Sequence, residues 1–194
     1  MNVDDPIALF LDCREAARLA GEPLNATCVA LATATSAGVP SVRHVLVKEV
    51  GSEGFYIYTN YDSDKARELD SNPVASLCFH FVTTHVQFRV TGPVERASAE
   101  RSDAYFAARP RESQLGAWGS EQSRPLASRD VMVERVAEVR DRFAEQPVPR
   151  PANWGGYRLM PERIEYWVDR PFRLHDRFVF VRTADGWSQT RLYP

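Results

Sequence analysis

The spacing of strand-like runs in the first half of this 194-residue chain limits the folds open to it. Five runs rich in β-branched and aromatic residues follow one another with short connections, over residues 27–35, 42–50, 55–59, 74–81 and 85–96. Turn residues separate them, as at Ser36-Ala37-Gly38 and from Gly51 to Gly54. This spacing is typical of a barrel or a sandwich and not of alternating β-α-β units.

Helix signals lie around these runs and after them. Asp5-Pro6 predicts an N-cap followed by Pro at the first helical position, and Ser63 and Ser128 are further N-cap candidates. The predicted helices cover residues 6–20, 63–69, 99–108 and 128–143, and the third ends at Arg109-Pro110. Further strands are expected over 156–159, 164–168 and a hairpin from 177 to 192 that turns at Asp185-Gly186. We therefore expect a mainly β, α+β fold.

Composition bounds the class of protein. The length suits one domain, and 24 basic against 26 acidic residues leave no global charge for nucleic acid or an anionic membrane. Cys13, Cys28 and Cys78 are odd in number and widely spaced, which disfavours a zinc site or a disulfide framework. No run approaches the ~20 apolar residues of a membrane span, and no signal peptide is visible. The sequence favours a cytoplasmic protein without a bound metal.

Several common catalytic motifs are absent from the sequence. There is no GxGxxG after a strand, no P-loop and no GxSxG. The four histidines are too scattered to propose a metal site. Any chemistry must therefore come from other groups.

A cluster of cations lies near the C-terminus. Two arginines and a histidine fall within Arg173-Leu174-His175-Asp176-Arg177, and Trp167 precedes them. The flanking residues look like buried strand. Cations beside a core are costly unless an anion meets them, so this cluster indicates a bound anion or a planar, electron-rich ligand.

Other cations and hydroxyls stand at predicted strand and helix ends: Arg43 with Lys48, Tyr58-Thr59 with Lys65, and Tyr105 with Arg109 and Ser113. Lys65 opens a helix, whose free N–H groups favour an anion. The last three residues are spaced by four and can converge on one small oxyanion. Each also has an ordinary explanation, because Arg43 and Lys48 fall on opposite faces of a regular strand and Trp167 is a natural core residue.

In order along the chain, these pieces resemble the pyridoxine (pyridoxamine) 5′-phosphate oxidase family. The resemblance rests on the motifs RHVLVK (43–48), YTN (58–60), Lys65, Gln87, YF (105–106), RPR (109–111), SQLGAW (113–118), QS (122–123), WGG (154–156), IEYW (164–167) and RLHDR (173–177). It extends over nearly the whole chain, and the C-terminal RLHDR is its most specific part.

The resemblance implies a split β-barrel, a Greek-key-like antiparallel barrel flanked by helices. It implies one FMN-binding domain over 1–194, in which 154–194 contributes to a dimer interface and to the active site. The protein is then a homodimer with two FMN sites at the subunit interface.

The resemblance also assigns roles to individual residues. The flavin contacts correspond to Arg43, Lys48, Tyr58, Thr59, Lys65, Gln87, Gln122, Ser123, Trp167 and Arg177. The site for the substrate phosphate corresponds to Lys48, Tyr105, Arg109 and Ser113. Arg173 and His175 correspond to catalytic residues that lie over the pyridine ring of the substrate.

The implied reaction oxidises pyridoxine 5′-phosphate or pyridoxamine 5′-phosphate to pyridoxal 5′-phosphate. A hydride passes from C4′ of the phosphorylated B6 vitamer to the flavin, and dioxygen is reduced to hydrogen peroxide. FMN and the vitamer each carry a phosphate monoester, and two separate cation clusters match that need. Two alternatives stay open: a related FMN oxidase with a phenazine-type reduced aromatic substrate, and a non-catalytic flavin- or vitamer-binding protein.

Three features depart from the family pattern. Asp64 stands before Lys65 where Arg is common, and we expect its carboxylate to point away from the FMN phosphate. Val86 stands before Gln87 where Arg is common, after Thr83-Thr84-His85, and His85 is expected to fill a strand position. The sequence begins just before the first predicted helix, so we expect no N-terminal arm over the substrate.

Overall fold

The computed structural model describes residues 3–22 and 28–194. Its helices are α1 (Pro6–Leu19), α2 (Asp64–Ser71), α3 (Ala99–Ala107), α4 (Arg111–Gly119), α5 (Arg129–Phe143) and the short 3-10 helix η2 (Pro171–Arg173). Its strands are β1 (Cys28–Ala34), β2 (Pro40–Gly51), β3 (Gly54–Asn60), β4 (Val74–Phe81), β5 (Val86–Arg96), β6 (Trp154–Leu159), β7 (Arg163–Val168), β8 (Asp176–Thr183) and β9 (Gly186–Leu192). No helix of these two ranges is long and apolar enough to cross a membrane.

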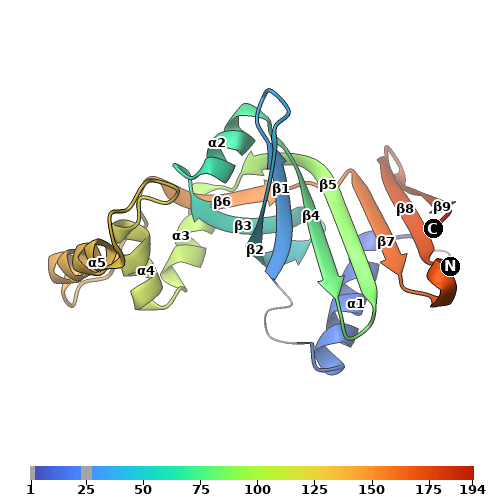
Figure 1. Ribbon diagram of the computed structural model, residues 1–194, viewed down its shortest axis with the longest axis horizontal. Coiled ribbons are helices and arrows are strands. Elements are labelled where there is room, and N and C mark those ends of the chain that lie inside the picture. Colours follow the sequence, from blue (N-terminus) through green and yellow to red (C-terminus); the bar gives the residue numbers. More distant parts are fainter. Residues whose placement is uncertain (1–2, 23–27) are drawn as a thin grey trace.

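The strands form an antiparallel split barrel, as expected. The order β4-β1-β2-β3-β6-β5 closes on itself because β4 also pairs with β5. Strands β7, β8 and β9 continue the sheet from the other part of β5 (Figure 1). All the pairings are antiparallel, and the helices flank the barrel.

Strand β5 divides its partners between the barrel and the extension. Residues 86–91 pair with β7, whereas 94–96 pair with β6. Gly92 lies at the change of partner, and a Cβ there would stand 1.9 Å from the Met160 carbonyl oxygen. The next residue, Pro93, has no N–H to give to a ladder, which suits a position where a strand changes neighbours. The Gly-Pro pair therefore marks where the barrel splits.

The main core lies between α1 and one face of the sheet. Phe10 is fully buried, and its ring centroid lies 5.3 Å from that of Phe55, 4.6 Å from Phe79 and 5.2 Å from Phe88. The helix begins as predicted, with the Asp5 carboxylate accepting from the N–H of Ile7 at 2.8 Å. The apolar side chains of the sheet thus face α1, and the opposite face of the sheet is not covered by this helix.

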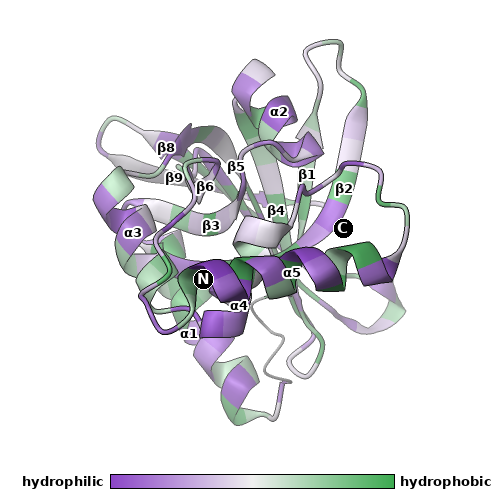
Figure 2. Ribbon diagram, turned by 90° about the vertical axis from the view of Figure 1, so that its left-hand side faces the viewer, coloured by the Kyte–Doolittle hydropathy of each residue, from purple (hydrophilic) through white to green (hydrophobic). Residues whose placement is uncertain are grey.

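A second, smaller core joins the three helices α3, α4 and α5 to β6. Phe106, Leu115, Phe143 and Trp154 are buried in it. In Figure 2, α5 crosses the front of α4 and is coloured hydrophilic over much of its length, in keeping with a helix that covers one side only. This helical end lies at the opposite end of the molecule from β8 and β9 (Figure 1).

Some local predictions were wrong. The third helix ends before Arg109-Pro110 as predicted, but Pro110 is also the N-cap of a further helix, α4, that was not predicted. Ser113 was placed just past a helix and lies inside α4. His85 is not in a strand but in the β4–β5 turn, with φ +56°. Thr27, the first residue of a predicted strand, lies outside the described residues.

Candidate functional site

Two adjoining pockets open between the barrel and the helical end, and both are lined by predicted site residues. Their volumes are about 300 Å³ and about 370 Å³, within the range of small-molecule sites. Their shared lining is Tyr58, Thr59, Arg109, Gln122 and Trp154. The first pocket adds Lys48, Lys65 and Tyr105, and the second adds Ser113. The fold thus gathers eight predicted residues from β2, β3, α2, α3, α4 and the α4–α5 loop.

Lys65 brings a charge to this site without a carboxylate of its own. Its Nζ donates to Thr59 Oγ1 at 3.1 Å, to Ser63 Oγ at 3.2 Å and to Gln122 Oε1 at 3.3 Å. Among the described residues, no carboxylate lies within ion-pair distance of that ammonium. Burial lowers the pKa of Lys65, and the charge of Arg43 lowers it further. The charges of Asp64 and Glu68 act in the opposite direction, so an anion placed here would meet a cation that has no direct carboxylate partner but is not isolated from negative charge.

Arg109 is the second such cation. Its guanidinium lies over the Trp154 ring, 4.5 Å from the centroid. Its Nη1 is buried and finds no acceptor within the described part of the chain. Burial lowers the pKa of Arg109. A buried donor without an acceptor destabilises the folded protein by about 1–3 kcal/mol. The position therefore favours a ligand that accepts a hydrogen bond from Arg109.

Aromatic rings form the wall between these cations. Tyr58 and Tyr105 stack with centroids 3.8 Å apart and planes inclined by 12°. The Tyr58 hydroxyl donates to Glu49 Oε1 at 2.6 Å. Burial and this carboxylate raise the pKa of Tyr58, so the phenol stays protonated. The stack holds Tyr105 beside Arg109.

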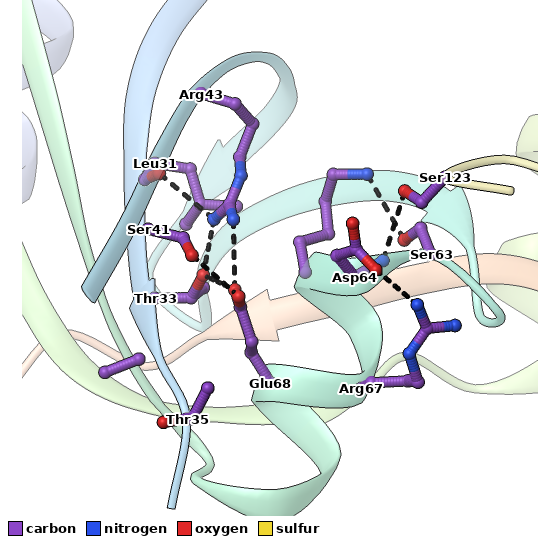
Figure 3. A network of polar contacts seen from close by, with 12 residues as sticks. Leu31, Thr33, Thr35, Ser41, Arg43, Ser63, Asp64, Arg67, Glu68 and Ser123 are labelled. Carbon is purple, nitrogen blue, oxygen red and sulfur yellow. Dashed lines mark hydrogen bonds and ion pairs between the residues drawn. The ribbon is translucent and has the colours of Figure 1, made fainter. Parts of the chain in front are cut away.

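Asp64 is the first residue of α2, directly before Lys65, and the orientation of its carboxylate relative to an FMN phosphate stays a prediction. The Asp64 carboxylate pairs with Arg67, and its side chain is largely exposed. Its backbone N–H donates to Ser123 Oγ at 3.2 Å (Figure 3). Ser63 does not cap this helix through its side chain, because its hydroxyl donates to the Asn60 carbonyl. Ser123 therefore stands at the start of α2.

Arg43 and Lys48 are separated, as their spacing predicts. The Arg43 Nη2 lies 3.0 Å from Glu68 Oε2, and its Nη1 donates to Thr33 (Figure 3). Lys48 lines the first pocket, and the β2–β3 ladder skips it at a bulge. Arg43 is thus paired with a carboxylate of its own chain, whereas Lys65 has no such direct pair among the described residues.

The C-terminal residues form a different group. Gln87 pairs with Trp167 across β5 and β7, and Trp167 pairs with Arg177 across β7 and β8, so the three stand in one row. The His175 ring lies 4.6 Å from the Trp167 ring, and its Nδ1 is 3.0 Å from Asp169 Oδ1. None of these residues lines the two pockets described above. Within one chain the two groups are not brought together.

Arg173 sits in the short helix η2, which the sequence analysis did not predict. Its φ is +62° and that of Phe172 is +61°, so the segment is strained. Arg173 is exposed and forms no ion pair among residues 3–22 and 28–194. It is therefore free to meet a ligand or a second chain.

Contrary to expectation, not every cation of the C-terminal cluster needs a bound anion. Arg177 meets an internal carboxylate, because its Nε and Nη2 donate to Glu165 Oε1 at 2.9 Å and 2.7 Å. Sequence reasoning did not give Glu165 or Glu49 a role, and it assigned none to Trp154. A single charged residue in a strand of alternating polar and apolar residues looks like a solvent-facing side chain, so the sequence alone does not indicate its partner.

The row of Gln87, Trp167 and Arg177 belongs to the sheet face opposite α1. Cross-strand register places Val42, Leu46 and Val181 on the same face, where they are 70%, 44% and 43% exposed.

A split barrel with two unneutralised cations in adjoining pockets defines a class of protein that binds anionic small molecules. Comparison with known proteins identifies the family within this class. Residues 17–143 match the family described as "Pyridoxamine 5′-phosphate oxidase", and residues 154–194 match the "Pyridoxine 5′-phosphate oxidase C-terminal dimerisation region". The chain belongs to the pyridoxamine 5′-phosphate oxidase family.

Named relatives support this membership. The chain is 50% identical over 190 residues to the pyridoxine/pyridoxamine 5′-phosphate oxidase of Gluconobacter oxydans, covering 98% of this chain and 94% of that one. It is 52% identical over 191 residues to the protein of the same name from Sphingopyxis alaskensis, covering 98% and 88%.

Solved structures agree on the fold. PhzG from Burkholderia lata, in complex with tetrahydrophenazine-1-carboxylic acid, superposes with a TM-score of 0.92 at 29% identity, covering 99% of this chain and 94% of that one. A pyridoxamine 5′-phosphate oxidase-related, FMN binding protein from Nostoc punctiforme has a TM-score of 0.78 at 17% identity, with both chains covered in full. The second likeness concerns the fold alone.

Proposed function

We propose that this protein is a pyridoxine/pyridoxamine 5′-phosphate oxidase that uses FMN. The observation that carries the proposal is the pair of half-buried cations, Lys65 and Arg109, which lack carboxylate partners in the described chain. FMN and the vitamer each bring a phosphate monoester with ~1.5 to 2 negative charges. Two separate cation positions in adjoining pockets fit two such groups, and about 50% identity to the named oxidases supports the same reaction.

Lys65, Ser123 and the α2 N-terminus are the groups that would hold the FMN phosphate. The ammonium supplies charge, and the start of α2 supplies the positive end of the helix dipole. Arg43 stands next to Lys65 and adds to the positive potential, although Glu68 neutralises part of its charge. When bound, FMN supplies the redox chemistry: it accepts a hydride from C4′ of the vitamer and is reoxidised by dioxygen, with release of hydrogen peroxide.

Arg109 is the main group for the substrate phosphate. Its buried N–H needs an acceptor, and Tyr105, Ser113 and Lys48 stand on the walls of the same pockets. A guanidinium can bind a phosphate through two parallel hydrogen bonds, which fixes the orientation of the substrate. Precise orientation matters because C4′ must lie ~3–3.5 Å from its hydride acceptor.

The residues at the C-terminal end would complete the site from a second copy of the chain. Arg173 and His175 are assigned to the pyridine ring, and Gln87, Trp167 and Arg177 to the flavin, yet they lie apart from the pockets in one chain. The exposed apolar face around their row, and the match to a dimerisation region, support a homodimer. The 1–194 domain would then be one half of a two-site enzyme.

The direct test uses purified protein reconstituted with FMN and supplied with pyridoxine 5′-phosphate in air. Aldehyde and hydrogen peroxide should form in equal amounts. A yellow protein that leaves the vitamer unchanged would overturn the oxidase assignment and support a non-catalytic binding protein.

The likeness to PhzG favours a second candidate, an oxidase of a reduced tricyclic aromatic substrate. The buried Arg109 donor could be met by the phosphate of the vitamer or by the carboxylate of a tricyclic acid, so turnover of each substrate is what separates the two candidates. Competition by inorganic phosphate against turnover would support the vitamer. Turnover of a reduced phenazine that is insensitive to phosphate would support the second candidate.

A further inference from the structure

Glu165 is a buried carboxylate in the sheet face that carries the Gln87-Trp167-Arg177 row. Glu165 lies on β7, two positions before Trp167, and is 3% exposed. Oε1 accepts from Arg177 Nε at 2.9 Å and Nη2 at 2.7 Å, and Oε2 accepts from Arg89 Nη2 at 2.5 Å. Arg163 Nη2 lies 3.7 Å from Oε2. One carboxylate thus stands among three guanidinium groups from three strands.

The carboxylate is ionised in this setting. Burial opposes ionisation of Glu165, but the hydrogen bonds from Arg177 and Arg89 outweigh it and lower the pKa of the carboxyl. An isolated buried carboxylate would be costly, and the hydrogen bond from Arg89 offsets part of that cost beside the two from Arg177. Arg89 and Arg163 are about half exposed and Arg177 is less so, which makes Arg177 the partner held most firmly.

The contacts on Arg177 leave part of its guanidinium unassigned. Two of its nitrogens donate to Glu165, and Nη1 donates to the Tyr193 carbonyl at 3.1 Å. A guanidinium has five N–H groups. The three that are occupied fix the plane of the group and leave two for another acceptor.

We propose that Glu165 is a positioning residue for the cofactor: it holds the Arg177 guanidinium in the plane and at the height at which its remaining N–H groups meet the flavin. Arg89 is the counter-cation of this arrangement. The inference rests on the proposed function through one step, the contact between Arg177 and FMN. Glu165 itself touches neither cofactor nor substrate.

The test is a double-mutant cycle read as FMN affinity. Glu165→Gln keeps the size of the side chain and removes its charge, and Arg177→Met removes the group on which it acts. Dissociation constants come from the quenching of FMN fluorescence on the apo-protein. Glu165→Gln should weaken FMN binding about tenfold in the wild-type background, the scale of one hydrogen bond to a charged group. In the Arg177→Met background it should have less than a twofold effect.

Two controls separate positioning from folding. Glu95→Gln removes a carboxylate of the same type from an exposed pair with Arg158 and should leave FMN affinity unchanged. Thermal unfolding of each apo-protein shows whether the variants are folded at the temperature of the titration. The absorption spectrum of bound flavin should shift in Glu165→Gln and not in Glu95→Gln.

Distinct results identify distinct failures. If the wild-type protein does not bind FMN, the cofactor assignment falls, and this inference falls with it. If the wild-type protein binds FMN and Glu165→Gln binds it equally well, only the role of Glu165 is overturned. Equal losses in the wild-type and Arg177→Met backgrounds would also overturn it, because Glu165 would then act on folding and not through Arg177.

Discussion

The Arg109 guanidinium lies over the Trp154 ring, 4.5 Å from its centroid, and one of its buried nitrogens has no acceptor in the described chain. The two residues come from the end of α3 and the start of β6. This contact joins the helical end of the molecule to the barrel. It also leaves a buried N–H of Arg109 without an acceptor in the pocket. The unpaired donor destabilises the folded protein, and a bound phosphate would offset this by accepting the hydrogen bond.

Replacing Arg109 should therefore separate stability from activity. Arg109→Met removes the unpaired donor and keeps an apolar stem against Trp154. We expect the KM for pyridoxine 5′-phosphate to rise about 100-fold, while the free protein becomes no less stable, with a gain of at most about 1–3 kcal/mol. Steady-state kinetics and thermal unfolding measure the two effects. Arg111→Met is the matched control, because Arg111 donates to the carbonyls of Ala144 and Gln146 and should affect stability alone.

FMN affinity should fall at alkaline pH through Lys65. Burial lowers the pKa of this lysine, so its ammonium loses its proton at a lower pH than an exposed lysine, whose pKa is ~10.4. FMN binding should weaken as pH rises through that lowered pKa. In the free protein the sign is opposite: the unfolded chain binds the proton more tightly, so stability from this group rises with pH over the same window.

Lys65→Arg provides the check, since a guanidinium keeps its charge throughout this range. Titrations of FMN fluorescence from neutral to alkaline pH should lose their pH dependence in this variant. An unchanged alkaline loss in Lys65→Arg would assign the effect to another group.

Asp64 pairs with Arg67 at the start of α2, and its charge lies close enough to Lys65 and the proposed phosphate site to act on both. Asp64→Arg reverses that charge at the first position of α2. We expect FMN to bind about fivefold more tightly, a gain of about 1 kcal/mol, which shrinks at high salt because the site is exposed. Fluorescence titration at two ionic strengths measures this, with Glu15→Arg on α1 as the control. Equal FMN affinity of Asp64→Arg and the wild-type protein would show that Asp64 in place of the family's usual Arg does not affect cofactor binding.

Arg173 should matter for turnover and not for cofactor binding. Arg173→Ala is expected to lower kcat/KM about 100-fold while the FMN dissociation constant stays within twofold, because its assigned contact is with the substrate ring. Arg182→Ala, which removes an exposed arginine that stacks on Trp187, is the control. Kinetics identical to wild type would remove Arg173 from the active site.

The split of the barrel depends on Gly92. A Cβ at this position would stand 1.9 Å from the Met160 carbonyl oxygen, which is backbone and cannot move aside. Gly92→Ala should lower the free energy of unfolding by about 2 kcal/mol or more, as overpacking against backbone does. Gly51→Ala is a matched control, because nothing lies within 4 Å of the added Cβ. Denaturant unfolding measures the free energy of unfolding of both variants. Equal values for Gly92→Ala and Gly51→Ala would contradict the role given to Gly92.

Much of the local structure was predictable because its causes are local. Asp5 caps α1 through a hydrogen bond to a residue two positions away, and Ser128 caps α5 through Val131 in the same way. Turns at Gly38 and Gly186 use the positive φ that glycine permits. The missed helix α4 has a local cause too, because a proline that follows the end of one helix also fits the position just before another begins.

The site was predictable only in part. The resemblance of ordered motifs named Lys65 and Arg109, and the structure shows that both lack partners. Whether Arg43 and Arg177 were equally free was not visible, because Glu68 and Glu165 look like ordinary solvent-facing charges in their own segments. Only the fold shows that these carboxylates neutralise them.

By itself, the sequence determined the α+β class, most helix and strand positions, and the family, since caps, turns, strand periodicity and ordered motifs act over a few neighbouring residues. Tertiary structure alone decided that β5 changes partners at Gly92. It also decided that Lys65 meets Gln122, 57 residues away, and that Arg177 is held by Glu165. These facts depend on sheet closure and register, where packing between distant segments selects one pairing among several that the local pattern allows equally well.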